Sequence, residues 1–327
     1  MSFAARRPFD RRRVPPLRSV LFVPGSDGKR LEEVARSRAD AVVLDLEEPE
    51  TPMSESVRER AHALCGELLR ERAERGVPDA PHLFVRTRAP STGWLWRDLT
   101  KVLAPSLEGI LLPKIEGPED VVAADALLLA AERETGLTPG SILLYPILET
   151  AQALRLAYEI AMASPRVAYM GGAISRFGDI HQALGYTWTA DGEETHFLRS
   201  KVLLDCRAAG IRYPISGMWG GSVDDEAGLR RWATRLRNLG YYGMMLGAEA
   251  HVPLVHEIFS PTPEQIAYWS ELVRLGDEAE RSGRGPVLHG DPDQGEGHEV
   301  HLAHIESARL NLEWSRDLGL AAPGPRS

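Results

Sequence analysis

Between residues 18 and 250, eight short apolar runs alternate with segments of helical character, and this alternation limits the fold more than any other feature. Each run has the length and the branched aliphatic side chains of a buried strand, whereas the segments between them space their apolar residues as amphipathic helices do. The runs cover residues 20–23, 41–44, 82–85, 109–112, 142–147, 167–170, 212–215 and 241–246. Eight such repeats at this length predict an α/β fold of the (β/α)₈ TIM-barrel type. No glycine-rich dinucleotide fingerprint follows the first run, which argues against a Rossmann domain.

The two flanks of this region differ from it in composition. Six arginines lie within residues 1–18, and we expect residues 1–17 to form a flexible basic arm. The barrel domain is predicted over residues 18–259. Residues 260–327 are predicted to form a C-terminal extension of helices and loops.

Within the extension, Thr262 and Pro263 have the residue types of a helix cap and a first helical position. Residues 282–298 are rich in Gly, Asp and His and poor in apolar side chains, so we expect a flexible loop there. The histidines of this region are irregularly spaced, which favours a loop over a metal site. A final helix is predicted over residues 306–314.

Bulk composition excludes several classes of protein. The chain has 327 residues, 43% of them hydrophobic, and a formal net charge of -9, which disfavours nucleic acid as a partner. No apolar run is long enough for a membrane span or a secretion signal. The two cysteines, Cys65 and Cys206, lack metal-type spacing and predict a reducing, cytoplasmic setting.

Two acids follow the fifth and sixth apolar runs. Glu149 comes two residues after the fifth run, and Asp179 comes nine residues after the sixth, beyond a Gly-Gly pair. In a parallel barrel the C-terminal ends of the strands lie side by side and face the ligand. Two hard oxygen ligands with open positions suit Mg²⁺, with Mn²⁺ as the alternative ion. The competing interpretation is structural, with Glu149 capping a helix and Asp179 closing a turn.

Five short motifs, in their order and spacing, resemble the citrate lyase β-subunit branch of the HpcH/HpaI aldolase superfamily. The similarity runs from about Arg18 to about Ile266, and each motif follows a predicted strand or begins one. The motifs are Arg18–Gly25 (RSVLFVPG), Asp40–Glu47 (DAVVLDLE), Leu112–Lys114 (LPK), Ile147–Thr150 (ILET) and Phe177–Asp179 (FGD). The resemblance implies a TIM barrel, a Mg²⁺ site, an enolate intermediate and a homotrimer or homohexamer.

The resemblance also assigns roles to residues at the matching positions. Glu149 and Asp179 resemble the metal-binding acids, and Arg86 resembles the arginine that holds the keto or carboxylate oxygen of the substrate. Asp45 and Glu47 match an acidic pair near the metal and its waters. The residue types suit this chemistry, because a divalent cation and a guanidinium can both stabilise the charge of an enolate.

Four further residues are predicted to bind substrate. Arg18 and Ser19 match the opening motif, and Lys114 matches the lysine after the fourth strand. Arg88 is a candidate for a substrate carboxylate, with a nearby protein acid as the alternative. Lys114 has a structural alternative too, a pair with Glu149.

Other polar and aromatic residues carry weaker predictions. His181, His251 and His256 are candidate bases, although most histidines in proteins are solvated or satisfied in the core. Loop tryptophans such as Trp94 and Trp188 are as compatible with packing under loops as with a pocket mouth.

The chain departs from the family pattern near its seventh and eighth strands. Met244 stands where the family has a lysine, and the His-Pro pair associated with the coenzyme A (CoA) substrate is missing from residues 243–249. Residues 214–217 lack an acid that some members use. The resemblance therefore supports the barrel and its metal site more strongly than the use of CoA.

Three functions follow from these observations. The leading prediction is a Mg²⁺-dependent carbon–carbon lyase that cleaves or forms a bond beside a carbonyl, acting on a small 2-keto acid or a β-hydroxyacyl-CoA. The second is a thioester hydrolase for a malyl-CoA-type ester. The third is a barrel that binds a ligand or a partner subunit without catalysis.

Overall fold

The computed structural model describes residues 14–47, 54–76, 81–172, 174, 176–283, 287–290 and 297–320. The chain divides into two compact units, residues 1–257 and residues 258–327, which are described separately. Most of the predicted basic arm lies outside the described residues. Its described end is packed, because Val14 and Leu17 are buried and the hydroxyl of Tyr169 donates to the carbonyl of Pro15 at 2.8 Å.

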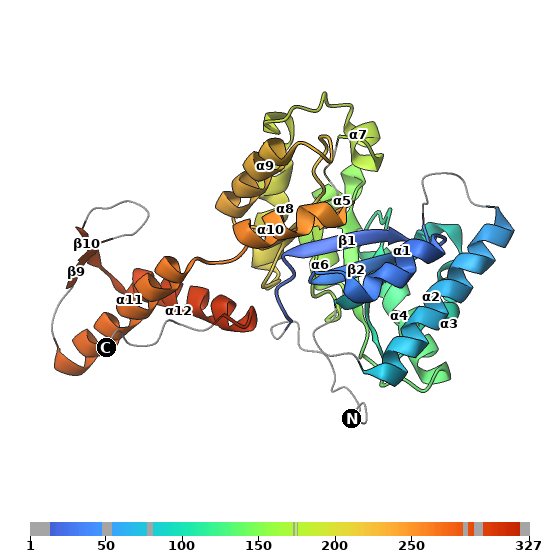
Figure 1. Ribbon diagram of the computed structural model, residues 1–327, viewed down its shortest axis with the longest axis horizontal. Coiled ribbons are helices and arrows are strands. Elements are labelled where there is room, and N and C mark those ends of the chain that lie inside the picture. Colours follow the sequence, from blue (N-terminus) through green and yellow to red (C-terminus); the bar gives the residue numbers. More distant parts are fainter. Residues whose placement is uncertain are drawn as a thin grey trace. The chain divides into compact units, whose positions relative to one another are not determined.

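The first unit is built on eight parallel strands in the described part of the chain (Figure 1). They are β1 (Ser19–Pro24), β2 (Ala41–Asp45), β3 (His82–Arg86), β4 (Leu107–Leu112), β5 (Leu143–Leu148), β6 (Gly171–Gly172), β7 (Ile215–Ser216) and β8 (Gly243–Leu246). The hydrogen-bonded order runs β6-β5-β4-β3-β2-β1-β8-β7. The N–H of Ile215 lies 3.4 Å from the carbonyl of Met170, so β6 and β7 nearly close the ring. The predicted TIM barrel is confirmed.

Helices connect the strands, with α2–α4 on one side of the strands and α8–α10 on the other (Figure 1). They are α1 (Gly28–Glu33), α2 (Glu55–Arg75), α3 (Leu95–Val102), α4 (Pro118–Glu134), α5 (Ala151–Arg155), α6 (Ala157–Met162), α7 (Asp179–Leu184), α8 (His196–Ala208), α9 (Glu226–Leu239) and α10 (Val252–Ile258). Short 3₁₀ turns are η2 (Val34–Arg36), η3 (Pro90–Thr92), η4 (Glu193–Thr195) and η5 (Glu249–His251).

Local chemistry fixes where these helices begin and end. The side chain of Ser54 accepts from the N–H of Val57 at the start of α2, and Gly76, with φ of 55°, ends it. Asp225 caps α9 in the same way and Gly240 ends it. Polar caps satisfy backbone donors that have no partner inside the helix, and glycine adopts the left-handed terminal conformation without a Cβ clash.

The last three strands of the barrel, β6, β7 and β8, are shorter than predicted, and β6 differs most. The run 167–170 makes only the isolated bridge between Leu144 and Val167, and β6 itself is the glycine pair that follows. A Cβ on Gly171 would lie 1.8 Å from the carbonyl oxygen of Ile215. The barrel therefore closes through backbone contact at a position where no side chain fits, which an apolar pattern cannot indicate.

The second unit holds helices α11 (Pro263–Ser282) and α12 (Leu302–Asp317) and a hairpin of β9 (Val287–Gly290) and β10 (Gly297–Val300). Its core includes Leu272, Val300 and Ala308. The predicted cap at Thr262 is confirmed as a capping box with Gln265. The predicted flexible loop is wrong where it is described, because β9 and β10 pair in antiparallel register there. Backbone pairing forms this hairpin without an alternating side-chain pattern, and residues 291–296 lie outside the described part.

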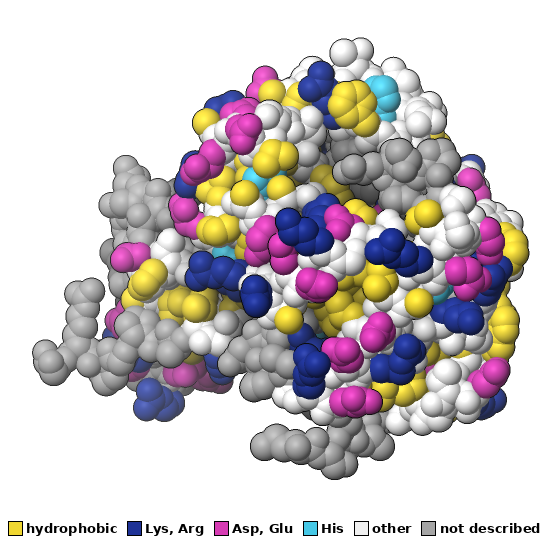
Figure 2. Space-filling model, turned by 45° about the vertical axis from the view of Figure 1, so that its right-hand side comes forward, with side chains coloured by type: hydrophobic (Ala, Val, Ile, Leu, Met, Phe, Trp, Pro, Cys, Tyr) yellow, Lys and Arg dark blue, Asp and Glu magenta, His cyan; other side chains and the backbone are white. Residues whose placement is uncertain are grey.

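The surface carries charges of both signs. On the face shown in Figure 2, Lys and Arg side chains alternate with Asp and Glu, and neither sign dominates among the coloured residues. Among the described residues, no helix has both the length and the apolar character needed to cross a membrane.

Candidate active site

The C-terminal ends of β2 and β3 place an acid and an arginine side by side. Asp45 ends β2, Arg86 ends β3, and the parallel register pairs the two residues. The Arg86 guanidinium forks onto the carboxylate, with Nε donating to Oδ1 at 2.8 Å and Nη2 donating to Oδ2 at 2.6 Å. Its charged carbon also lies 5.2 Å from the centre of the Phe22 ring. Bidentate pairing on an aromatic support fixes the orientation of the guanidinium.

Glu47 joins this pair from the loop after β2. Its backbone N–H donates to Asp45 Oδ1 at 3.0 Å, which fixes the turn of the chain after β2. Arg86 Nη1 lies 2.9 Å from Glu47 Oε2, and Lys114 Nζ lies 3.3 Å from Glu47 Oε1. Both cations therefore contact one buried carboxylate.

Lys114 connects the remaining acids. Among the described residues it is the one residue other than glycine with positive φ, at 50°. This conformation aims its backbone N–H at Glu149 Oε1, at 2.7 Å, while its Nζ lies 3.7 Å from Asp179 Oδ2. A left-handed lysine is strained, and such strain concentrates at functional sites. Sequence patterns carry no signal for it.

Asp179 owes its position to the residue before it. Gly178 has φ of 131° and ψ of -177°, a conformation that is open essentially to glycine alone. Helix α7 begins directly afterwards at Asp179, whose side chain is 38% exposed. The acid therefore lies at the solvent side of the group, whereas Asp45, Glu47 and Glu149 are buried.

We call the six residues Asp45, Glu47, Arg86, Lys114, Glu149 and Asp179 the carboxylate–cation group. It contains two more acids than cations. Burial, followed by the charge of Glu47, raises the pKa of Glu149 to about 7, against the opposing effect of Arg86. Burial works against the charge of Arg86, but its hydrogen bond to Asp45 and the charges of Asp45 and Glu47 raise its pKa above the ordinary value. The group thus keeps a permanent guanidinium beside an acid that resists ionisation.

A divalent cation fits the acids left without a full counter-charge. Within the described residues no three His, Cys, Asp or Glu side chains form a complete metal-binding set. Mg²⁺ does not require one, because it is commonly held by one or two carboxylates together with waters and substrate oxygens. Glu149 and Asp179, linked through Lys114, provide such a pair.

Three residues expected at the substrate lie outside this group. Arg18 and Ser19 lie at the start of β1, the opposite end of the strand from Pro24, about 15–20 Å from the level of the acids. Arg18 instead forks onto Asp40 at 2.8 and 2.7 Å. Arg88 lies at the correct end of its strand, but its guanidinium is buried on Asp98.

The Arg88 contact has a clear structural role. Asp98 is fully buried and accepts from the backbone and the side chain of Arg88 and from His62. Burial opposes ionisation of Asp98, but the hydrogen bonds from His62 and Arg88 lower its pKa. Trp94 covers the Arg88 guanidinium at 4.7 Å. The structure therefore matches the alternative in which Arg88 binds an acid of the protein.

The candidate histidine bases make their side-chain contacts outside the group. His256 Nε2 lies 2.7 Å from Ser19 Oγ at the opposite end of the barrel, and His251 Nε2 lies 3.0 Å from the carbonyl of Val223. His181 packs edge-on against Tyr186. None of these contacts includes a member of the carboxylate–cation group.

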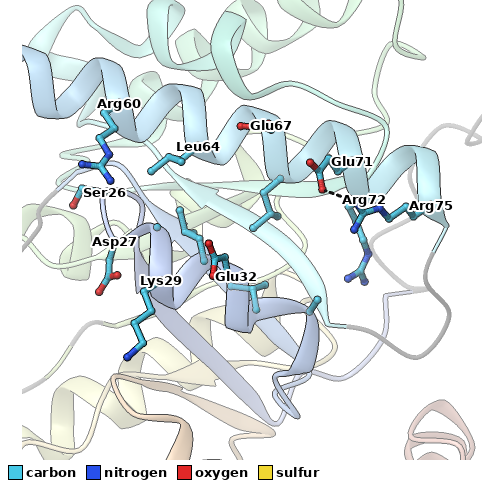
Figure 3. Close-up of a pocket in the computed structure, with 15 residues that line it drawn as sticks. Ser26, Asp27, Lys29, Glu32, Arg60, Leu64, Glu67, Glu71, Arg72 and Arg75 are labelled. Atoms are coloured by element: carbon cyan, nitrogen blue, oxygen red, sulfur yellow. Dashed lines mark ion pairs between the residues drawn. The ribbon is translucent and has the colours of Figure 1, made fainter.

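A cleft of about 1030 Å³ lies away from the acids, between α1 and α2. Figure 3 shows Arg60 and Leu64 on α2 facing Asp27, Lys29 and Glu32 across it. None of its lining residues belongs to the carboxylate–cation group. Cavity volume alone would therefore favour this cleft as the functional site. The charge, the burial and the backbone strain of the carboxylate–cation group favour the C-terminal end of the barrel instead.

Comparison with known proteins identifies relatives of this chain. The sequence model of the HpcH/HpaI aldolase/citrate lyase family matches residues 18–248. A (3S)-malyl-CoA thioesterase from Cereibacter sphaeroides is 30% identical over 299 residues, covering 91% of this chain and 94% of the relative. An L-malyl-CoA/beta-methylmalyl-CoA lyase from the same species is 29% identical over 315 residues, covering 90% and 93%.

Solved structures share the fold. A citrate lyase from Burkholderia xenovorans LB400 superposes with a TM-score of 0.74 at 20% identity, covering 97% of this chain and 98% of that one. CitE from Mycobacterium tuberculosis, in complex with magnesium, acetoacetate and coenzyme A, gives a TM-score of 0.66 at 23% identity, covering 93% and 99%.

Proposed function

Because this chain belongs to the HpcH/HpaI aldolase/citrate lyase family, we propose that its carboxylate–cation group is the active site of a Mg²⁺-dependent carbon–carbon lyase. The proposed substrate is a malyl-CoA-type β-hydroxyacyl thioester or a related 2-oxo acid. The observation that carries the proposal is the convergence of Arg86 and two pairs of acids at one barrel end. The names of the malyl-CoA relatives and the ligands of CitE support the substrate class and the ion.

Arg86 is the residue that holds the oxyanion. Among the described residues, Asp45 and Glu47 occupy three of its five N–H groups, so two remain for substrate oxygens. The guanidinium is held rigidly before the substrate arrives, and a preorganised donor stabilises developing charge without having to reorient. Asp45 accordingly positions Arg86, since both of its oxygens are taken up by that fork.

Glu149 and Asp179 would hold the metal. When bound, Mg²⁺ supplies a second positive charge that polarises the substrate carbonyl. Cleavage requires that the substrate hydroxyl lose its proton while the adjacent carbon–carbon bond breaks, which leaves an aldehyde or ketone and the enolate of the other product. Glu47 is the acid best placed to move that proton through a water molecule, because it lies between the two cations and its backbone is fixed on Asp45.

Hydrolysis of the thioester is the second candidate function. The thioesterase relative is as similar to this chain as the lyase relative. The Ser19, His256 and Asp40 cluster does not provide a hydrolase triad, since Ser19 is fully buried and Asp40 approaches the same His256 nitrogen as the serine. A hydrolytic step would therefore also use the carboxylate–cation group.

Product analysis with malyl-CoA and Mg²⁺ tests the proposal. Cleavage yields glyoxylate and acetyl-CoA, whereas hydrolysis yields malate and free CoA. We expect Glu149→Gln to weaken Mg²⁺ binding by at least about tenfold in calorimetry and to remove turnover. Glu159→Gln, on the exposed face of α6, is the control. Equal turnover in EDTA, or in the Glu149 variant, would overturn the metal-dependent assignment.

We also propose a cytoplasmic homotrimer or homohexamer. The two free cysteines are compatible with a reducing compartment. Apolar side chains on the packed helices α6 and α8 support self-association, since Phe197 and Leu204 on α8 are 73% and 68% exposed and Met162 on α6 is 47% exposed. Light scattering of the purified chain tests the assembly, and a monomer at micromolar concentration would contradict it.

A further inference from the structure

Arg176 lies beside the active-site end of the barrel and has no part in the function proposed above. It follows β6 and precedes Asp179 by three residues, so their Cα atoms are within about 11 Å even along an extended chain. Its guanidinium lies 5.1 Å from the ring centre of Phe177 and 5.4 Å from that of Trp188. Two aromatic faces thus hold a cation at the rim of the site.

A cluster of three tryptophans supports this arrangement. Trp188 lies 5.6 Å from Trp219 and 6.5 Å from Trp232, ring centre to ring centre, and Trp232 is buried. A Cβ on Gly220 would lie 2.6 Å from the Cβ of Arg176, so the loop after β7 meets this residue directly. The backbone of Arg176 therefore packs against the loop after β7, which limits where this residue can lie.

Ion pairing distinguishes Arg176 from Arg97, the other arginine compared with it. Arg97 also covers an indole, at 5.1 Å from the ring centre of Trp94, but it pairs with Glu55 and Glu59. Arg176 is exposed and makes no ion pair with any of the described residues. Aromatic stacking orients a guanidinium while leaving its edge of N–H donors available, which suits a planar oxyanion.

We propose that Arg176 binds a second carboxylate of the substrate, distal to the reacting carbonyl, and so selects dicarboxylic over monocarboxylic 2-oxo acids. This inference rests on the proposed function. Arg86 and the acids serve the reacting end, and Arg176 precedes Asp179 by only three residues, so the proposal assigns it to the other end of a four- or five-carbon acid. The carboxylate is favoured over a CoA phosphate because Arg176 is so near Asp179 in the chain.

The test compares binding of oxaloacetate and pyruvate to the full chain in Mg²⁺ by calorimetry. For Arg176→Met we expect the Kd of oxaloacetate to rise about 10- to 100-fold while that of pyruvate changes less than about twofold. Arg176→Lys keeps the charge and loses the fork, and we expect it to fall between the two. Arg97→Met, the matched control, is expected to leave both values unchanged.

The outcomes are distinct. If wild-type protein binds neither acid in Mg²⁺, the inference is overturned, and the product analysis with malyl-CoA decides the proposed function separately. If wild-type protein binds both and the Arg176 variants lose neither, or lose both equally, the proposed function stands and the inference is overturned. Weakened binding of desulfo-CoA with unchanged oxaloacetate affinity would assign Arg176 to the nucleotide phosphates and would also overturn it.

Discussion

The two ends of the same barrel each carry an arginine forked onto an aspartate, and the two forks differ in their surroundings. At the C-terminal end, Arg86 holds Asp45 within the carboxylate–cation group. At the N-terminal end, Arg18 holds Asp40, with Ser19 and His256 close by. The hydrogen-bond lengths of the two forks are nearly identical, so geometry at the arginine does not distinguish them.

Charge balance distinguishes them. The Arg18 fork pairs one cation with one acid, and burial lowers the pKa of the neighbouring His256. The carboxylate–cation group has surplus acids in a buried setting, and one consequence is the raised pKa of Glu149. Surplus buried charge is costly for folding, so a group that retains it is a candidate for binding a cation.

Removal of each arginine tests the comparison most strongly. Arg86→Met is expected to lower kcat/KM by about 10³-fold and to destabilise the fold by about 3 kcal/mol, because it leaves Asp45 buried without its counter-charge and Glu47 with Lys114 alone. Steady-state kinetics and urea denaturation measure the two effects.

Arg18→Met is the matched variant. Its partner Asp40 is 16% exposed, so water offsets part of the loss, and we expect about 1 kcal/mol of destabilisation with turnover within about twofold of wild type. Comparable losses of activity in both variants would erase the distinction between the two ends.

A pH series sharpens the comparison with an effect of about one order of magnitude. The pKa of Glu149 is raised to about 7, so Mg²⁺ affinity is expected to rise about tenfold between pH 6 and pH 8 as this acid ionises. The stability of the metal-free protein moves the other way. A raised folded-state pKa contributes stability that is complete below the unfolded value and is lost as the pH rises through about 7, which amounts to about 1 kcal/mol between pH 6 and pH 8.

Calorimetry measures the Mg²⁺ affinity at each pH. Thermal denaturation in EDTA measures the stability of the metal-free protein. Glu149→Gln has no proton to exchange at this position, so both pH dependences are expected to flatten in that variant. Parallel trends in the wild type, with affinity and metal-free stability rising together, would contradict the assignment of Glu149 as the titrating acid.

The smallest effect concerns Lys114. Lys114→Met removes one of the two cations of the group, and we expect Mg²⁺ to bind about three- to fivefold more tightly with a loss of stability below about 1 kcal/mol, since the ammonium is 30% exposed. Lys29→Met, on the exposed side of α1, is the control. Weaker Mg²⁺ binding would instead show that the lysine holds Asp179 in place for the ion.

Much of this protein follows from its sequence. The eight apolar runs specify the barrel, because parallel strands buried on both faces require continuous apolar side chains. Asp45, Arg86 and Glu149 are assigned to one end of it, because each ends or follows a run and parallel strands end together. The helix cap at Thr262 can also be predicted from the sequence, because a cap acts through hydrogen bonds to residues close in the chain.

Only the tertiary structure decided the rest. It gave Lys114 its left-handed backbone, placed Gly178 so that Asp179 meets the group, and put Arg18 and Ser19 at the opposite end from the acids. It also placed Arg176 against aromatic rings, without an ion pair to any of the described residues, and it paired Arg88 with Asp98. These outcomes depend on contacts between segments far apart in the chain, and a linear pattern records which side chains are present but not which charges remain unbalanced once they are brought together.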